Sequence, residues 1–120
     1  MKTNMEFIMR FNKATPLNEV IFNTLINTGS YIFPIQTIQM EASEDGKQYK
    51  QIQSVDFTNI TKAYSKETNI NQTQAFKLKV PKGKTYKYYK FTLRNLKQLP
   101  QWHPGKGTPA WIFVDEVFFN

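Results

Sequence analysis

The sequence FKLKVPKGKTYKYYKFTLR, residues 76–94, contains the clearest strand pattern in the chain. Apolar side chains occupy alternate positions on each side of the turn sequence PKGK: Phe76, Leu78 and Val80 before it, and Tyr89, Phe91 and Leu93 after it. Because successive side chains of a strand point to opposite faces, this spacing predicts two strands. Each strand is expected to have one buried face and one solvated face.

The same period of two recurs toward the N-terminus. It predicts strands at about residues 5–11, 17–26 and 38–43. Asp45-Gly46 follows the third of these and is a strong signal for a hairpin turn, after which Tyr49 begins another strand.

Two longer segments have other patterns. Residues 57–73 are polar with little periodicity, which predicts a long connection that crosses between sheets. Residues 111–119 are almost continuously apolar, as expected for a strand covered on both faces. Six to eight short strands at this spacing predict an all-β fold with little helix, in which two antiparallel sheets pack as a β-sandwich or jelly roll.

Length and charge limit the function. The 120 residues predict a single domain over 1–120, and the absence of cysteine excludes disulfides and thiolate chemistry. The net charge of +7 favours an acidic partner, such as a nucleic acid, an anionic glycan or a lipid headgroup. No stretch is long and apolar enough to predict a membrane span or a secretory signal.

The residues that carry chemistry give no sign of an enzyme. His103 is the one histidine, so a zinc site built from histidine and cysteine is excluded, and no metal or other cofactor is expected. Asp115 and Glu116 are neighbours on a predicted strand, so their carboxylates point to opposite faces and cannot flank one bond. The Gly105-Lys106-Gly107 sequence lacks the Ser or Thr that a phosphate-binding loop needs directly after its lysine.

Half of the basic residues form a lysine-rich band without any intervening acid: Lys77, Lys79, Lys82, Lys84, Lys87, Lys90, Arg94 and Lys97. With Tyr86 and Tyr88 interleaved, the lysine-rich band is compatible with a nucleic-acid backbone and stacked bases. The favoured interpretation is that alternating lysines form the solvated faces of strands and discourage aggregation, so we do not expect nucleic acid as the partner.

Four stretches resemble the C-terminal domain of bacterial family-20 β-N-acetylhexosaminidases, the chitobiase-like enzymes. The most specific is residues 99–116, LPQWHPGKGTPAWIFVDE, and the others are TGSYIFP at 28–34, SEDGK at 43–47 and YYKF at 88–91. That domain is a galactose-binding-like sandwich of the coagulation-factor C-type, or discoidin, group. The resemblance implies a bacterial accessory module without catalysis, located in the periplasm, at the cell surface or outside the cell.

The sequence departs from this family in two respects. Such domains usually begin some tens of residues earlier, with a strand and a loop that often binds calcium, so this chain is expected to be N-terminally shortened and to lack the usual first strand. Glu116 matches an acidic residue that supports the calcium site, but its loop partners are missing and no calcium is predicted. The family's catalytic carboxylates lie on a separate barrel domain, so Asp115 and Glu116 are not their equivalents.

These observations predict carbohydrate binding through loops at one end of the sandwich. A sugar site needs an aromatic ring and a few oriented polar groups, and the predicted ligand-binding residues are Tyr31, Trp102, His103 and Lys106. Alternatively, Trp102 packs beneath its own loop, and the domain docks on a glycosidase catalytic domain or self-associates through an open sheet edge without binding sugar.

Overall fold

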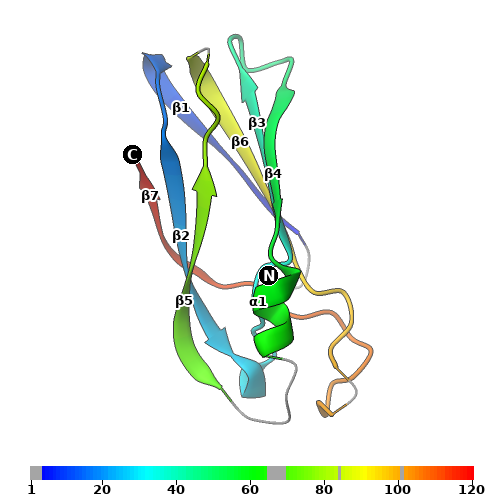
Figure 1. The fold of residues 1–120 in the computed structure, drawn as a ribbon. Helices are drawn as coiled ribbons and strands as arrows, with labels where there is room; N and C mark the ends of the chain where they lie inside the picture. The colour runs from blue at the N-terminus through cyan, green and yellow to red at the C-terminus, as the bar shows by residue number, and fades with distance from the viewer. Residues whose placement is uncertain (1–3, 65–69, 84, 101) are drawn as a thin grey trace.

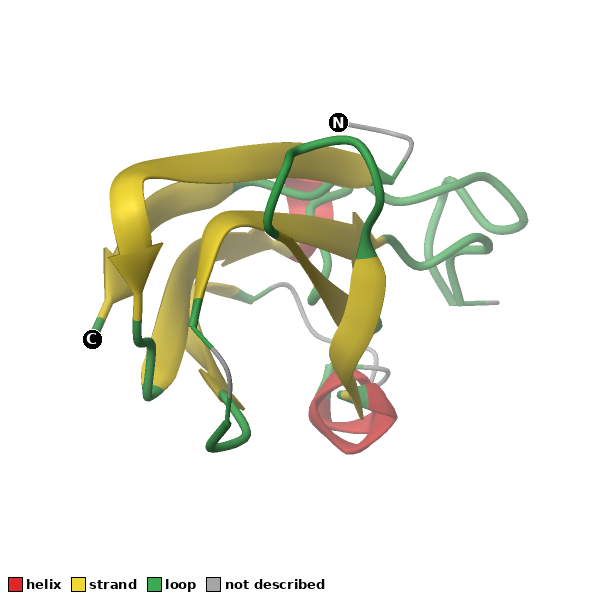
Figure 2. Ribbon diagram, turned by 90° about the horizontal axis from the view of Figure 1, so that it is seen from above, coloured by secondary structure: helices red, strands yellow, loops and turns green. Residues whose placement is uncertain are grey.

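The computed structural model describes residues 4–64, 70–83, 85–100 and 102–120. Its elements, in chain order, are β1 (Met5–Thr15), β2 (Glu19–Asn27), the 3-10 helix η1 (Thr28–Ser30), β3 (Thr37–Ser43), β4 (Lys50–Asp56), α1 (Thr58–Ala63), β5 (Asn71–Lys79), β6 (Tyr86–Arg94) and β7 (Val114–Phe119). The described strands form two antiparallel sheets, in the orders β1-β6-β3-β4 and β5-β2-β7. The two sheets lie as layers (Figures 1 and 2), which confirms the predicted β-sandwich.

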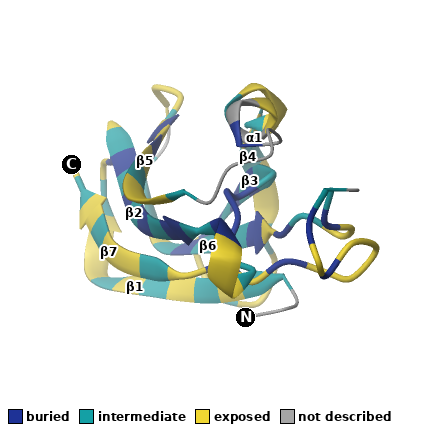
Figure 3. Ribbon diagram, turned by 90° about the horizontal axis from the view of Figure 1, so that it is seen from below, coloured by how far each residue is buried: buried dark blue, intermediate teal, exposed yellow. Residues whose placement is uncertain are grey.

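The predicted alternation places the core between the two sheets. Three residues of β6 are buried: Tyr89, Phe91 and Leu93. In β5, Phe76 and Leu78 are buried, whereas the alternating lysines at positions 77 and 79 are exposed. Figure 3 shows buried positions, in dark blue, recurring along strands of both sheets. Burial of these apolar side chains away from water is the main stabilising contribution to the fold.

The turn after β5 joins the two sheets rather than two neighbouring strands. β5 pairs with β2, whereas β6 pairs with β1 and β3. Residues 80–85 therefore cross from one layer to the other, and Lys84 lies outside the described residues. Alternation alone could not distinguish this crossing from a hairpin, because both put a turn between two amphipathic strands.

The hairpin predicted at Asp45-Gly46 is confirmed, since β3 and β4 pair on either side of it. The Asp45 carboxylate oxygen Oδ1 accepts hydrogen bonds from the backbone N–H of Lys47 at 2.8 Å and of Gln48 at 3.0 Å, and from the Ser43 hydroxyl at 2.9 Å. These donors favour the ionised carboxylate and lower the Asp45 pKa from 3.8 to about 2. Gly46 has φ of +77°, and its turn lies against the ring of Tyr88.

The Asp45 pKa predicts an acid-dependent loss of stability. Because the folded-state pKa is depressed, the contribution of the ionised carboxylate is present above about pH 4 and is lost as the pH falls toward about 2. We expect the stability difference between the wild type and Asp45→Asn to be largest at neutral pH and to shrink through this range. Urea unfolding at pH 7, 4, 3 and 2 measures it. A difference that stays constant with pH would contradict the assignment.

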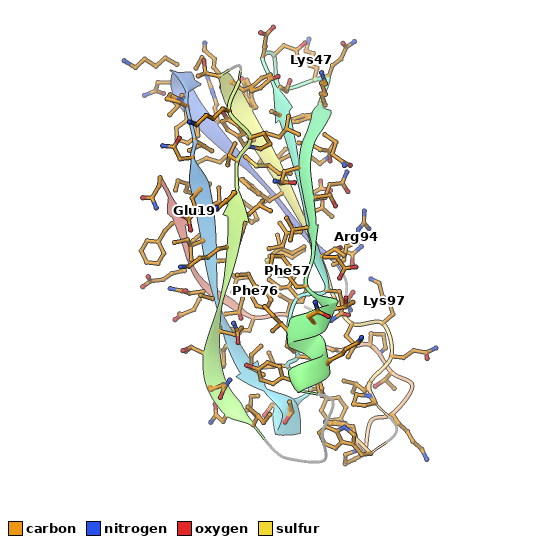
Figure 4. The ribbon with its side chains drawn as sticks, viewed as in Figure 1. Glu19, Lys47, Phe57, Phe76, Arg94 and Lys97 are labelled. Carbon is orange, nitrogen blue, oxygen red and sulfur yellow. The ribbon has the colours of Figure 1, made fainter. Side chains whose placement is uncertain are left out.

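The polar segment 57–73 contains α1 and crosses from β4 of one sheet to β5 of the other, as expected, with 65–69 outside the described residues. The backbone N–H of Thr58 donates to the Asp56 carboxylate at 2.8 Å as the helix begins. Phe57 faces Phe76 with the ring centroids 5.0 Å apart (Figure 4), so the start of α1 is anchored to the core near β5.

The expectation that residues 111–119 form a strand covered on both faces is wrong. β7 is one of the two edge strands of its sheet, and Phe113 and Phe118 are 49% and 45% exposed. A run of apolar residues shows how much apolar surface is present but not whether another layer covers it. The register of β7 against β2 shifts between Asn23 and Thr24, opposite the exposed carboxylates of Asp115 and Glu116.

Candidate functional site

The four predicted ligand-binding residues lie at one end of the sandwich, on two segments far apart in sequence. Tyr31 directly follows η1, and Trp102, His103 and Lys106 belong to the loop of residues 95–113, here called the Trp102 loop. Figure 1 shows both segments at the lower end of the molecule. A small apolar cluster of Phe33, Leu99 and Ala110 underlies them, with Tyr31 and Trp102 packed against it.

His103 is buried and both of its ring nitrogens have partners. Nε2 lies 2.6 Å from the backbone carbonyl oxygen of Thr28, and Nδ1 lies 2.9 Å from the backbone nitrogen of Gly105. A carbonyl can only accept and an amide N–H can only donate, so this geometry assigns the neutral ring with its proton on Nε2. The imidazole thus ties the Trp102 loop to η1, and neither nitrogen is free to coordinate a ligand.

The Tyr31 ring packs at the contact between η1 and the Trp102 loop. It has φ of +68°, a left-handed conformation that is uncommon for residues other than glycine. Its ring meets the His103 ring edge-on at 4.6 Å between centroids. A Cβ atom at Gly105 would stand 2.3 Å from the Tyr31 ring, so only glycine leaves room for this packing.

Tyr31, Trp102 and Lys106 are the members of the set that reach solvent, whereas His103 is buried. The Trp102 ring lies 5.5 Å from His103 and 6.5 Å from Phe33 between centroids, and it is half-buried. Lys106 is exposed, and its backbone N–H donates to the His103 carbonyl at 3.0 Å. The structure therefore brings Tyr31, Trp102 and His103 into one packed cluster, with the half-buried Tyr31 and Trp102 and the exposed Lys106 at its surface.

The lysine-rich band is divided between the two layers. Lys77 and Lys79 lie on the solvated face of β5, whereas Lys90 and Arg94 lie on the outer face of the other sheet. Lys90 is 3.8 Å from the Glu6 carboxylate, and Arg94 donates to the side-chain oxygen of Gln39 at 3.1 Å. The charges of these four described members of the lysine-rich band are therefore divided between the two sheets.

A surface that the alternation pattern missed follows the edge strand. We call the exposed aromatic rings of Trp111, Phe113 and Phe118 the aromatic row; they are 42%, 49% and 45% exposed. Phe118 lies opposite Ile21, and the Phe113 carbonyl accepts from the Leu25 N–H, so the row runs beside β2. Exposed apolar rings gathered along one edge are typical of an interaction surface.

Among the described residues, no group of three or more His, Cys, Asp or Glu side chains is placed to hold a metal ion. The described part of the chain also contains no helix with the length and hydropathy needed to cross a membrane.

No protein-family model matches the chain, and no curated protein matches it. Among solved structures, the chain is similar to the C-terminal domain of a chitobiase from Bacteroides fragilis, with a TM-score of 0.53 and 25% sequence identity. The likeness covers 98% of this chain and 62% of the chitobiase chain, so this chain spans less than two thirds of the length of the chitobiase chain. It supports the interpretation of the chain as a related domain and as an accessory, non-catalytic module.

Proposed function

We propose that this domain is the accessory module of a glycoside-hydrolysing enzyme and binds carbohydrate through the Trp102 loop. The likeness to a chitobiase C-terminal domain supports the accessory role. The observation that carries the sugar-binding proposal is the Trp102 ring, which is partly exposed on a loop fixed by buried hydrogen bonds. A fixed ring loses little conformational entropy when a ligand stacks on it.

Each of the four residues has a distinct part in this proposal. Trp102 offers an apolar surface to one face of a pyranose ring, and Lys106 offers a donor to its hydroxyl groups. Tyr31 extends the aromatic surface from the neighbouring segment. His103 is a positioning residue, because its nitrogens already bind Thr28 and Gly105.

Calorimetry with chitobiose and a glycan array tests this proposal. We expect Trp102→Ala to weaken binding at least about tenfold, which corresponds to about 1.4 kcal/mol. The matched control is Phe118→Ala, which removes an exposed aromatic ring on β7 and is expected to leave affinity unchanged. Thermal unfolding verifies that both variants are folded. Equal binding by all three proteins, or no binding by the wild type, would contradict the assignment.

The aromatic row favours a second function, docking on a catalytic domain. Its three exposed rings provide the apolar contact area on which interfaces between domains depend. β7 pairs with β2 and, in the part of the chain that the structure describes, with no other strand, which also leaves an edge for self-association. If the wild type binds no glycan, the accessory role rests on this surface instead.

A further inference from the structure

A cleft of about 460 Å³ opens at the end of the sandwich opposite the Trp102 loop. Four segments line it: the turn between β1 and β2 at residues 16–18, the start of β4 at 50–52, the turn after β5 at 80–83, and the start of β6 with Thr85, Tyr86 and Tyr89. Figure 1 shows these strand ends together at the top of the molecule. The volume is within the range of clefts that bind small molecules.

Hydrogen bonds join the segments that line the cleft and fix their relative positions. The Tyr89 hydroxyl donates to the Thr15 carbonyl at 2.8 Å and accepts from the Tyr86 N–H at 3.3 Å, so it fixes the start of β6 against the end of β1. The Tyr86 and Tyr89 rings pack edge to face at 6.1 Å. The Val80 N–H donates to the Asn18 carbonyl at 2.9 Å, and this bond joins the turn after β5 to the turn between β1 and β2.

A side-chain bridge also crosses between the sheets at this end of the molecule. The Gln53 amide of β4 donates to the Lys79 carbonyl of β5 at 2.8 Å. This contact links the two sheets beside the cleft, whereas the hydrogen bonds above join segments that belong to the same sheet. A ligand would therefore enter a preformed site and would not have to order its walls.

The lining combines apolar side chains, an aromatic ring and positive charge. Leu17, Ile52 and Val80 supply apolar side chains, and Tyr86 supplies a ring. Lys50 and Lys82 are exposed at the surface of the cleft, and none of the described residues that line it is acidic. These groups match a ligand with an apolar ring face, hydroxyl groups and a carboxylate.

An adjoining cleft of about 340 Å³ indicates how such a ligand would be oriented. It shares Lys50 and Tyr86 with the first cleft, and Glu44 and Asp45 are among its lining residues. The negative charges therefore lie next to the part of the first cleft that Lys50 and Tyr86 line, whereas Lys82 lines the first cleft alone. A carboxylate would be repelled from that side and attracted toward Lys82.

We infer that the cleft lined by Tyr86 and Lys82 binds an acidic saccharide, with the uronic acid carboxylate paired to Lys82. This site is separate from the Trp102 loop, so it does not depend on the proposed function. The Tyr86 ring would contact the sugar ring, while Asn18, Gln51 and Thr85 are the polar lining residues available to its hydroxyl groups.

Amide chemical-shift titration of the whole chain with digalacturonate tests the inference. We expect saturable shifts at residues that line the cleft, and at least about tenfold weaker binding of the neutral galactobiose. Lys82→Gln is expected to weaken digalacturonate binding about tenfold, whereas Lys77→Gln, which removes the same charge from the solvated face of β5, leaves it unchanged. Trp102→Ala should also leave it unchanged, so this result is independent of the glycan test above.

Four outcomes would overturn the inference. One is the absence of saturable shifts. The second is equal weakening by both lysine variants, which would show a general effect of net charge. The third is equally tight binding of inorganic phosphate, which would show that the cleft takes any anion. The fourth is a set of shifts confined to the Trp102 loop, which would place acidic sugars at the other end of the molecule.

Discussion

Replacing His103 with alanine is expected to lower the free energy of unfolding by about 3 kcal/mol, because a buried hydrogen-bonding ring is exchanged for a cavity. The variant loses the bonds to the Thr28 carbonyl and the Gly105 N–H, and it loses ring contacts with Tyr31, Phe33 and Trp102. The Gly105 N–H is then left without its acceptor. Urea unfolding followed by tryptophan fluorescence measures the change.

Two further variants separate the contributions of this residue. In His103→Asn, the short side chain can still accept from the N–H two residues ahead, so we expect it to recover part of the lost stability. Lys106→Ala alters an exposed side chain in the same loop and should change stability by less than about 0.5 kcal/mol. If His103→Ala is as stable as Lys106→Ala, the imidazole does not hold the Trp102 loop in place.

Replacing Phe91 with alanine is expected to cost about 3–5 kcal/mol, the range for deleting a large buried aromatic side chain. Phe91 is fully buried on β6, and its ring lies 5.2 Å from Phe7 of the same sheet. Across the core, it lies 5.5 Å from Phe22 and 5.9 Å from Phe119. The cavity would remove contacts between both layers, and small domains have only about 5–15 kcal/mol of stability in total.

Phe118→Ala is the matched control for this prediction, since it makes the same chemical change on the exposed side of β7. We expect it to cost less than about 1 kcal/mol. Equilibrium unfolding in urea compares both variants with the wild type. Similar losses at the two positions would contradict the placement of Phe91 at the centre of the core.

The strand positions could be predicted from the sequence because burial on one face leaves a local pattern of period two. Met40, Phe91 and Leu93 follow this pattern and are buried. Whether a second layer covers a strand depends on distant segments and leaves no local signal. Phe113 and Phe118 therefore have the composition of covered residues but lie at a solvated edge.

The sequence indicated that Trp102 and His103 lie in one tight loop, but it did not indicate what these side chains contact, and their role in binding stays a prediction. The Pro104-Gly105 turn marks a tight loop near Trp102, and the resemblance to hexosaminidase domains singled out the same segment. His103 has its second partner, Thr28, 75 residues earlier in the chain, so its burial could not be read from local sequence. The cleft beside Tyr86 was missed for the same reason, since four separate segments form it.

The strand order β1-β6-β3-β4 has a consequence for biosynthesis. β6 lies between β1 and β3 and is synthesised after both of them. Until residues 86–94 are synthesised, β1 lacks its neighbouring strand in this sheet, and its apolar residues lack their native contacts with β6. Pairings between strands so far apart in sequence slow folding and lengthen the time during which apolar residues are open to aggregation.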